Sequence, residues 1–69
     1  MNEFDEQFCE KTHVAAIGLL ESKAVEYFQG RESLGVLNAY ERAAVGSGLL
    51  TSTEADGIIE GIRRRYRRS

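Results

Sequence analysis

The fold of this 69-residue chain is indicated most clearly by residues 49–54, Leu49-Leu50-Thr51-Ser52-Thr53-Glu54. Thr51, followed three residues later by Glu54, fits a capping box, in which each side chain accepts a hydrogen bond from the other residue's backbone N–H. Leu50 precedes the cap and fits the hydrophobic staple that fixes how a chain enters a helix. The stretch therefore predicts that a helix begins close to Ser52.

The helix that follows is predicted to run from about Ser52 to about Arg67. Its apolar residues recur at three- and four-residue steps and share one face: Ala55, Ile58, Ile59, Ile62 and Tyr66. Arginines gather at its C-terminal end, where the helix dipole favours cations. Gly57 and Gly61 have GxxxG spacing, and the charged residues around them exclude a membrane helix. We expect these glycines to allow another helix of the bundle to approach closely.

Two turns are predicted upstream of this helix, at Gly46-Ser47-Gly48 and at Gly30-Arg31-Glu32-Ser33. Gly30 suits the left-handed position that closes a helix, and Ser33 can cap the next one. Residues 34–45 are therefore predicted to form a short helix between the turns. The residues expected to face inward are Leu34, Leu37, Tyr40 and Ala44, and those expected to face water are Glu41 and Arg42.

Residues 3–29 are predicted to form one long helix or a helix pair. The apolar face expected from the spacing consists of Phe4, Phe8, Thr12, Ala15, Leu19 and Tyr27. The segment Val14–Leu20 is apolar on every side, which predicts that more than one neighbour covers it. An unbroken helix here would span roughly 40 Å at 1.5 Å per residue, too long for the two shorter helices to cover. Either a bent first helix or a homodimer resolves this, and we favour the homodimer.

These elements predict an all-α fold: a single small helical domain over residues 1–69, with one long helix followed by two shorter ones, packed as a homodimer. The chain has one cysteine and one histidine, so it cannot form an internal disulfide or, as a monomer, an ordinary structural zinc site. Small domains usually need a disulfide, a metal site or self-association for stability, and self-association is the one that remains for this chain. We expect no cofactor and no metal.

The sequence also predicts a cytoplasmic protein without a membrane span. Its longest apolar stretch, Val14–Leu20, has 7 residues, far fewer than a bilayer crossing needs. The N-terminal residues are acidic, whereas a signal peptide begins with a basic region. A lone thiol, Cys9, favours a reducing compartment.

Cys9 and His13 are four residues apart and would share one face of an unbroken helix. This spacing suits two metal ligands or a thiolate–imidazole pair, so a metal or redox switch is one hypothesis. The sequence supplies neither an obvious further ligand set nor an oxyanion site, so we favour a simple thiol beside a surface histidine. Because no phosphate-binding loop, dinucleotide fingerprint or nucleophile elbow occurs either, we expect no enzyme.

Charge is divided unevenly along the chain. Residues 1–62 carry four basic and 11 acidic side chains, a net charge of −7, whereas residues 63–69 carry five arginines and no acid. The basic C-terminal end, 63–69, could bind phosphates and stack on bases, grip carboxylates of a protein, or remain a solvated helix end. The acidic body disfavours a polyanion, and Glu54 and Asp56 disfavour a helix-turn-helix over residues 39–62.

We therefore predict a non-enzymatic protein-binding module that acts as a stoichiometric regulator or inhibitor of a protein target. Its size and charge division are those of many small regulators made by phages and mobile elements. The alternative is a nucleic-acid-binding accessory protein that uses the same arginines. Aromatic and arginine residues dominate binding energy at interfaces. The residues predicted to contact the partner are Tyr40, Arg63, Arg64, Arg65, Tyr66, Arg67 and Arg68.

Overall fold

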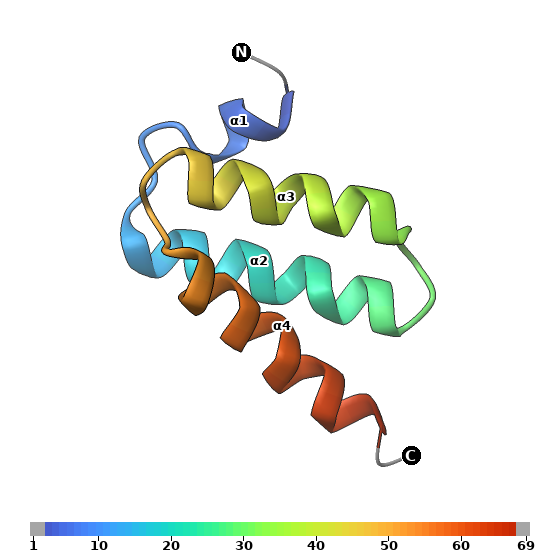
Figure 1. Cartoon of the computed structure of the whole chain (residues 1–69). Helices are drawn as coiled ribbons and strands as arrows, with labels where there is room; N and C mark the ends of the chain where they lie inside the picture. The colour runs from blue at the N-terminus through green and yellow to red at the C-terminus, as the bar shows by residue number, and fades with distance from the viewer. Residues whose placement is uncertain (1–2, 68–69) are drawn as a thin grey trace.

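A computed structural model describes residues 3–67, and side chains from residue 6 onward. It contains four helices in that range: α1 (Glu3–Phe8), α2 (His13–Phe28), α3 (Leu34–Gly46) and α4 (Ser52–Arg67). The helix α2 is central, with α3 antiparallel to it and α4 crossing it, while α1 lies across the C-terminal part of α3 (Figure 1). Residues 3–67 contain no strand, so the all-α prediction is confirmed.

The predicted first helix is divided, so the helix pair is right and the count of three helices is wrong. Glu10 has a φ of 65°, in the left-handed region that interrupts a helix. Thr12 has extended backbone geometry, and its hydroxyl accepts a hydrogen bond at 3.1 Å from the N–H of Ala15. Thr12 therefore caps a new helix instead of continuing the first one.

This break lets α1 fold back onto α3. Phe8, the last residue of α1, is only 1% exposed and meets the ring of Tyr40 edge-on, with centroids 6.2 Å apart. The bend thus buries the first part of the predicted long helix against α3, where we expected a second copy to cover it. The length of the first helix is therefore no longer a reason to expect a homodimer.

The buried face of α2 differs from the prediction. The structure buries Ala16, Leu20 and Ala24, whereas Ala15 and Thr12 are exposed and Leu19 is only partly buried. Because α2 begins independently at His13, the spacing of apolar residues in α1 does not determine which face of α2 is buried. The side chain of Phe4, which was part of the predicted face, lies outside the described residues.

Several of the most deeply buried core positions are alanine. Larger core side chains come from all four helices and the last connection: Phe8, Leu20, Leu37, Tyr40, Leu50 and Ile62. Between them, Ala16, Ala24, Ala44 and Ala55 are completely buried, which lets the helices approach closely. Leu34 was expected inside but is 52% exposed, because it begins α3 at the edge of the bundle.

The predicted capping box is present. The Thr51 N–H donates to Glu54 Oε1 at 2.9 Å, and the Glu54 N–H donates to Thr51 Oγ1 at 3.1 Å. Leu50 is buried before the cap, and α4 has the predicted bounds. Glu54 also contacts His13 Nε2 at 2.7 Å, so the same carboxylate connects the N-termini of α2 and α4.

The other turn predictions are confirmed as well, apart from the role of the GxxxG spacing. Gly30 has a φ of 80°, and Ser33 Oγ accepts from the Val36 N–H at 3.2 Å to cap α3. Gly57 and Gly61 were expected to meet another helix of the bundle, but a Cβ on either would find no atom of the described part within 4 Å. They face open space on α4. None of the described helices has both the length and the apolar character that a bilayer crossing requires.

The fold predicts an unequal response to two apolar truncations. Phe8→Ala should lower the free energy of unfolding by about 3 kcal/mol or more, because it opens a cavity and removes the contact of α1 with Tyr40. Val14→Ala, at a position 76% exposed, should change it by less than about 0.5 kcal/mol. Urea unfolding followed by circular dichroism measures both, and equal losses would show that α1 does not belong to the core.

Candidate functional site

The exposed arginines lie on the last two turns of α4. Arg63, Arg64, Arg65 and Arg67 are all exposed, as the sequence predicts for a basic helix end, and Arg68 lies outside the described residues. The helix gives each guanidinium a defined direction. Arg63 lines a groove between the helices, whereas Arg65 lines a shallow pocket on the other side of α4, with Glu21 and Glu26 of α2.

Tyr66 holds this helix end against α2. Its ring stacks on Phe28 with centroids 6.1 Å apart and an interplanar angle of 18°. Its hydroxyl oxygen accepts a hydrogen bond at 3.1 Å from Gln29 Nε2. The partly buried Tyr66 therefore positions the arginines around it, and only part of its surface is open to a partner.

Tyr40, the other aromatic predicted to contact a partner, lies in the core. Its side chain packs on Phe8, and Lys23 Nζ is 5.1 Å from its ring centroid. With 6% of its surface exposed, Tyr40 has little area to offer another molecule. The structure thus gives it a structural role, and we do not include it in the binding surface.

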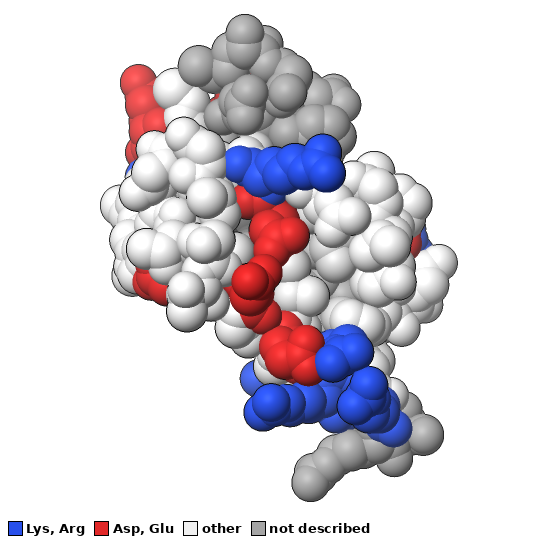
Figure 2. Space-filling model, viewed as in Figure 1, with Lys and Arg blue, Asp and Glu red and all other residues white. Residues whose placement is uncertain are grey.

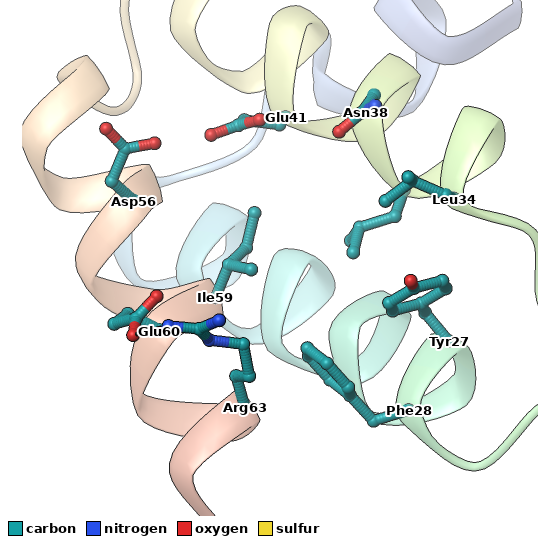
Figure 3. Close-up of a pocket in the computed structure, with 10 residues that line it drawn as sticks. Tyr27, Phe28, Leu34, Asn38, Glu41, Asp56, Ile59, Glu60 and Arg63 are labelled. Carbon is teal, nitrogen blue, oxygen red and sulfur yellow. Dashed lines mark hydrogen bonds and ion pairs between the residues drawn. The ribbon is translucent and has the colours of Figure 1, made fainter. Parts of the chain in front are cut away.

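A groove of about 300 Å³ between α2, α3 and α4 was not predicted from the sequence. Its apolar lining comes from Tyr27, Phe28, Leu34, Leu37 and Ile59. Its polar lining comes from Asn38, Glu41, Asp56, Glu60 and Arg63, and Figure 3 shows these side chains along the α3 and α4 sides. It combines an apolar surface with three carboxylates.

Glu41 and Asp56 face each other across this groove (Figure 3). Burial raises the pKa of Glu41, and a hydrogen bond with Asp56 and the negative charge of Asp56 raise it further. The positive charge of Arg42 acts in the opposite direction and is the weakest of these influences. The two helices thus bring together like charges that repel when both are ionised.

Glu60 experiences the opposite environment. It forms an ion pair with Arg63, one turn further along α4. The hydrogen bond from Arg63 lowers the pKa of Glu60, and the charges of Arg63, Arg64 and Arg67 lower it further. Figure 2 shows this face of the molecule: acidic side chains form a band down its middle, most basic side chains lie below the band, and a further basic side chain borders its upper end.

Cys9 and His13 do not share a helix face, because the helix that would align them is broken. Cys9 is exposed in the turn after α1, and His13 begins α2 and contacts Glu54. Within the described residues, no three His, Cys, Asp or Glu side chains come together to form a metal site. The spacing that motivated a metal or redox switch therefore has no structural counterpart.

The groove and the arginines are groups that bind through ion pairs and apolar contact. The chain matches no protein-family model, no curated protein and no solved structure.

The acidic pair predicts a stabilising substitution. Glu41→Gln should raise the melting temperature near pH 7, because it removes a partly buried negative charge facing Asp56 and retains hydrogen-bonding atoms. A carboxyl with a raised folded-state pKa stabilises the protein below its ordinary value of 4.5, and this contribution is lost as pH rises through the raised pKa. The advantage of the variant should therefore shrink between pH 7 and pH 4 in thermal unfolding.

The matched control is Glu21→Gln, which removes the same charge from an exposed position on α2. It should show a smaller gain at pH 7. Equal gains from both substitutions would mean that overall net charge, not the contact with Asp56, limits stability.

Proposed function

We propose that the protein is a non-enzymatic binding module that acts as a stoichiometric regulator or inhibitor of a protein target. The observation that carries this proposal is the arginine cluster, exposed on a helix end that Tyr66 fixes against Phe28 and Gln29. Arginine can pair with carboxylates in a bidentate manner and is enriched among residues that dominate binding energy. The target surface is therefore acidic.

Arg64 and Arg65 are the strongest candidates for this contact. Successive residues of a helix are turned by about 100°, so these two side chains lie away from the groove that Arg63 lines. Both are exposed. Because the folded helix already holds them in place, binding loses less conformational entropy than it would from a flexible tail.

A nucleic-acid partner is the second candidate, favoured by the same exposed guanidiniums. They could contact backbone phosphates, and such binding would weaken steeply as salt rises. A long polyanion extends past the arginines, so it would also approach residues 1–62, which carry four basic and 11 acidic side chains, whereas an acidic patch on a protein can end at the arginine cluster. We therefore place a protein target first.

We also propose that the chain forms a homodimer in the cytoplasm. A small domain without a disulfide gains stability by covering apolar surface in an assembly. Apolar surface remains open in this fold at Val14, at Leu34 and along the groove. The lone Cys9 thiol suits a reducing compartment.

The target proposal is tested by affinity capture from the lysate of the native host. The wild-type chain should retain a protein in stoichiometric amount at moderate salt. Arg64→Ala/Arg65→Ala should reduce its capture by about tenfold or more, because it removes the bidentate donors that pair with the target.

The control variant is Arg31→Ala/Arg42→Ala, which removes the same charge at two exposed positions elsewhere. It should leave capture nearly unchanged. Equal loss from both variants would indicate that total charge, not the end of α4, drives binding. Recovery of nucleic acid alone, lost as salt rises, would replace the protein target with the second candidate.

A further inference from the structure

One side of α4 carries acids on its first half and arginines on its second half. Asp56, Glu60, Arg63 and Arg67 are separated by four, three and four residues, so they form one stripe along the helix. The first three line the groove. Read from the N-terminus, the charges of this stripe are two negative and then two positive.

At the first end of the stripe, Asp56 and the neighbouring Glu41 form no ion pair with any residue from 6 to 67, although the charge of Arg42 acts on Glu41. At the other end, Arg67 is exposed and likewise forms no ion pair within that range. The inner members of the stripe, Glu60 and Arg63, already pair within one chain, whereas Asp56 and Arg67 are eleven residues apart and cannot reach each other.

We propose that a second copy of the chain docks along this stripe, with the two α4 helices antiparallel. In that orientation Arg67 of each copy meets Asp56 of the other. The Glu60–Arg63 pairs of the two copies lie against each other, so that each Arg63 also meets the Glu60 of the other copy. The two pairs share one register, since residues 56 and 67 have the same midpoint as residues 60 and 63. A two-fold axis at that midpoint makes each pair twice.

The surface around the stripe is suited to a second helix. Gly57 and Gly61 follow Asp56 and Glu60 and lie about 100° further round α4, where a side chain at either position would meet no described atom within 4 Å. On that side of the stripe the first half of α4 therefore has no side chain at these two positions to hold an approaching helix away. Leu34, at the rim of the groove, is 52% exposed and would be covered. The apolar lining of Phe28 and Ile59 extends this contact beside the charges.

Charge complementarity favours a second copy over an unrelated basic segment. Any basic peptide could neutralise Glu41 and Asp56, but the second copy also presents carboxylates to Arg63 and Arg67. An isologous interface must be self-complementary, and this stripe is. Arg65 lies on the opposite side of α4, and Arg64 flanks the stripe on the side of Gly57 and Gly61. This inference rests on the homodimer proposed above and specifies its interface.

The test is a charge exchange between two full-length variants. In the first, Asp56→Arg/Glu60→Arg makes the stripe entirely positive, and in the second, Arg63→Glu/Arg67→Glu makes it entirely negative. Sedimentation equilibrium at low salt and up to about 1 mM chain should show the wild type dimerising. Each variant alone should dimerise at least about tenfold more weakly, because like charges now face each other.

An equimolar mixture of the two variants should form a heterodimer, because every pair is again of opposite sign. This heterodimer and the wild-type dimer should both weaken at about 0.5 M salt, since exposed charges are screened. Arg31→Glu/Arg65→Glu is the matched control, with the same charge change at two exposed positions on the other side of α4, and it should dimerise much more strongly than Arg63→Glu/Arg67→Glu. Circular dichroism verifies folding, and Asp56→Asn/Glu60→Gln gives a milder variant that should also weaken the dimer.

The outcomes separate this interface from the homodimer itself. A wild type that remains monomeric up to about 1 mM would overturn both. A wild-type dimer that persists unchanged in the charge-reversed and neutral variants would overturn the interface and leave the homodimer standing. Failure of the mixture to associate, with both variants folded, would also overturn the α4 pairing.

Discussion

The hydrogen bond from the Ala15 N–H to the Thr12 hydroxyl marks the constraint on which the rest of the structure depends. It begins α2 four residues after α1 has ended, with Glu10 in left-handed geometry between them. A chain continuing straight through this point would carry Phe8 away from α3. Because it turns, Phe8 instead closes the core against Tyr40 and leaves α2 free to contact both α3 and α4.

The groove follows from this arrangement. The helices α3 and α4 both pack on α2 (Figure 1) and contact each other less. The groove of about 300 Å³ lies between them. Polar residues line that space because it remains open to water, yet it is narrow enough for Glu41 and Asp56 to affect each other. The last turns of α4 stay attached to α2 through Tyr66 and Phe28, which keeps the arginines beside the acidic groove. The groove, the position of the arginines and the core are thus set by the same helix packing.

Local signals in the sequence predicted the local structure well. The capping box at Thr51 and Glu54, the left-handed Gly30 and the apolar stripe of α4 each depend on residues close together in the chain, and all are present. The break before α2 was left open, because Thr12 can either cap a helix or continue one, and packing of Phe8 decides between them. The groove could not be predicted, because Glu41 and Asp56 lie on different helices and only their packing on α2 brings them together. In the candidate site, the exposed position of the arginines at a helix end was predicted from the sequence. Tyr40 was predicted both to face inward and to contact a partner, and the structure agrees with the first of these, because an amphipathic pattern does not show how far a neighbouring helix covers an aromatic ring.

The alanines of the core bear on how the protein responds to temperature. Ala16, Ala24, Ala44 and Ala55 are completely buried, but each contributes a single methyl group. The heat capacity of unfolding rises with the apolar area that becomes hydrated, and for a domain of this length it is already below about 1 kcal/mol/K. A core built in part from methyl groups places it toward the lower end of that range. The stability curve is correspondingly broad and shallow, so the fold changes its stability little between cold and warm surroundings.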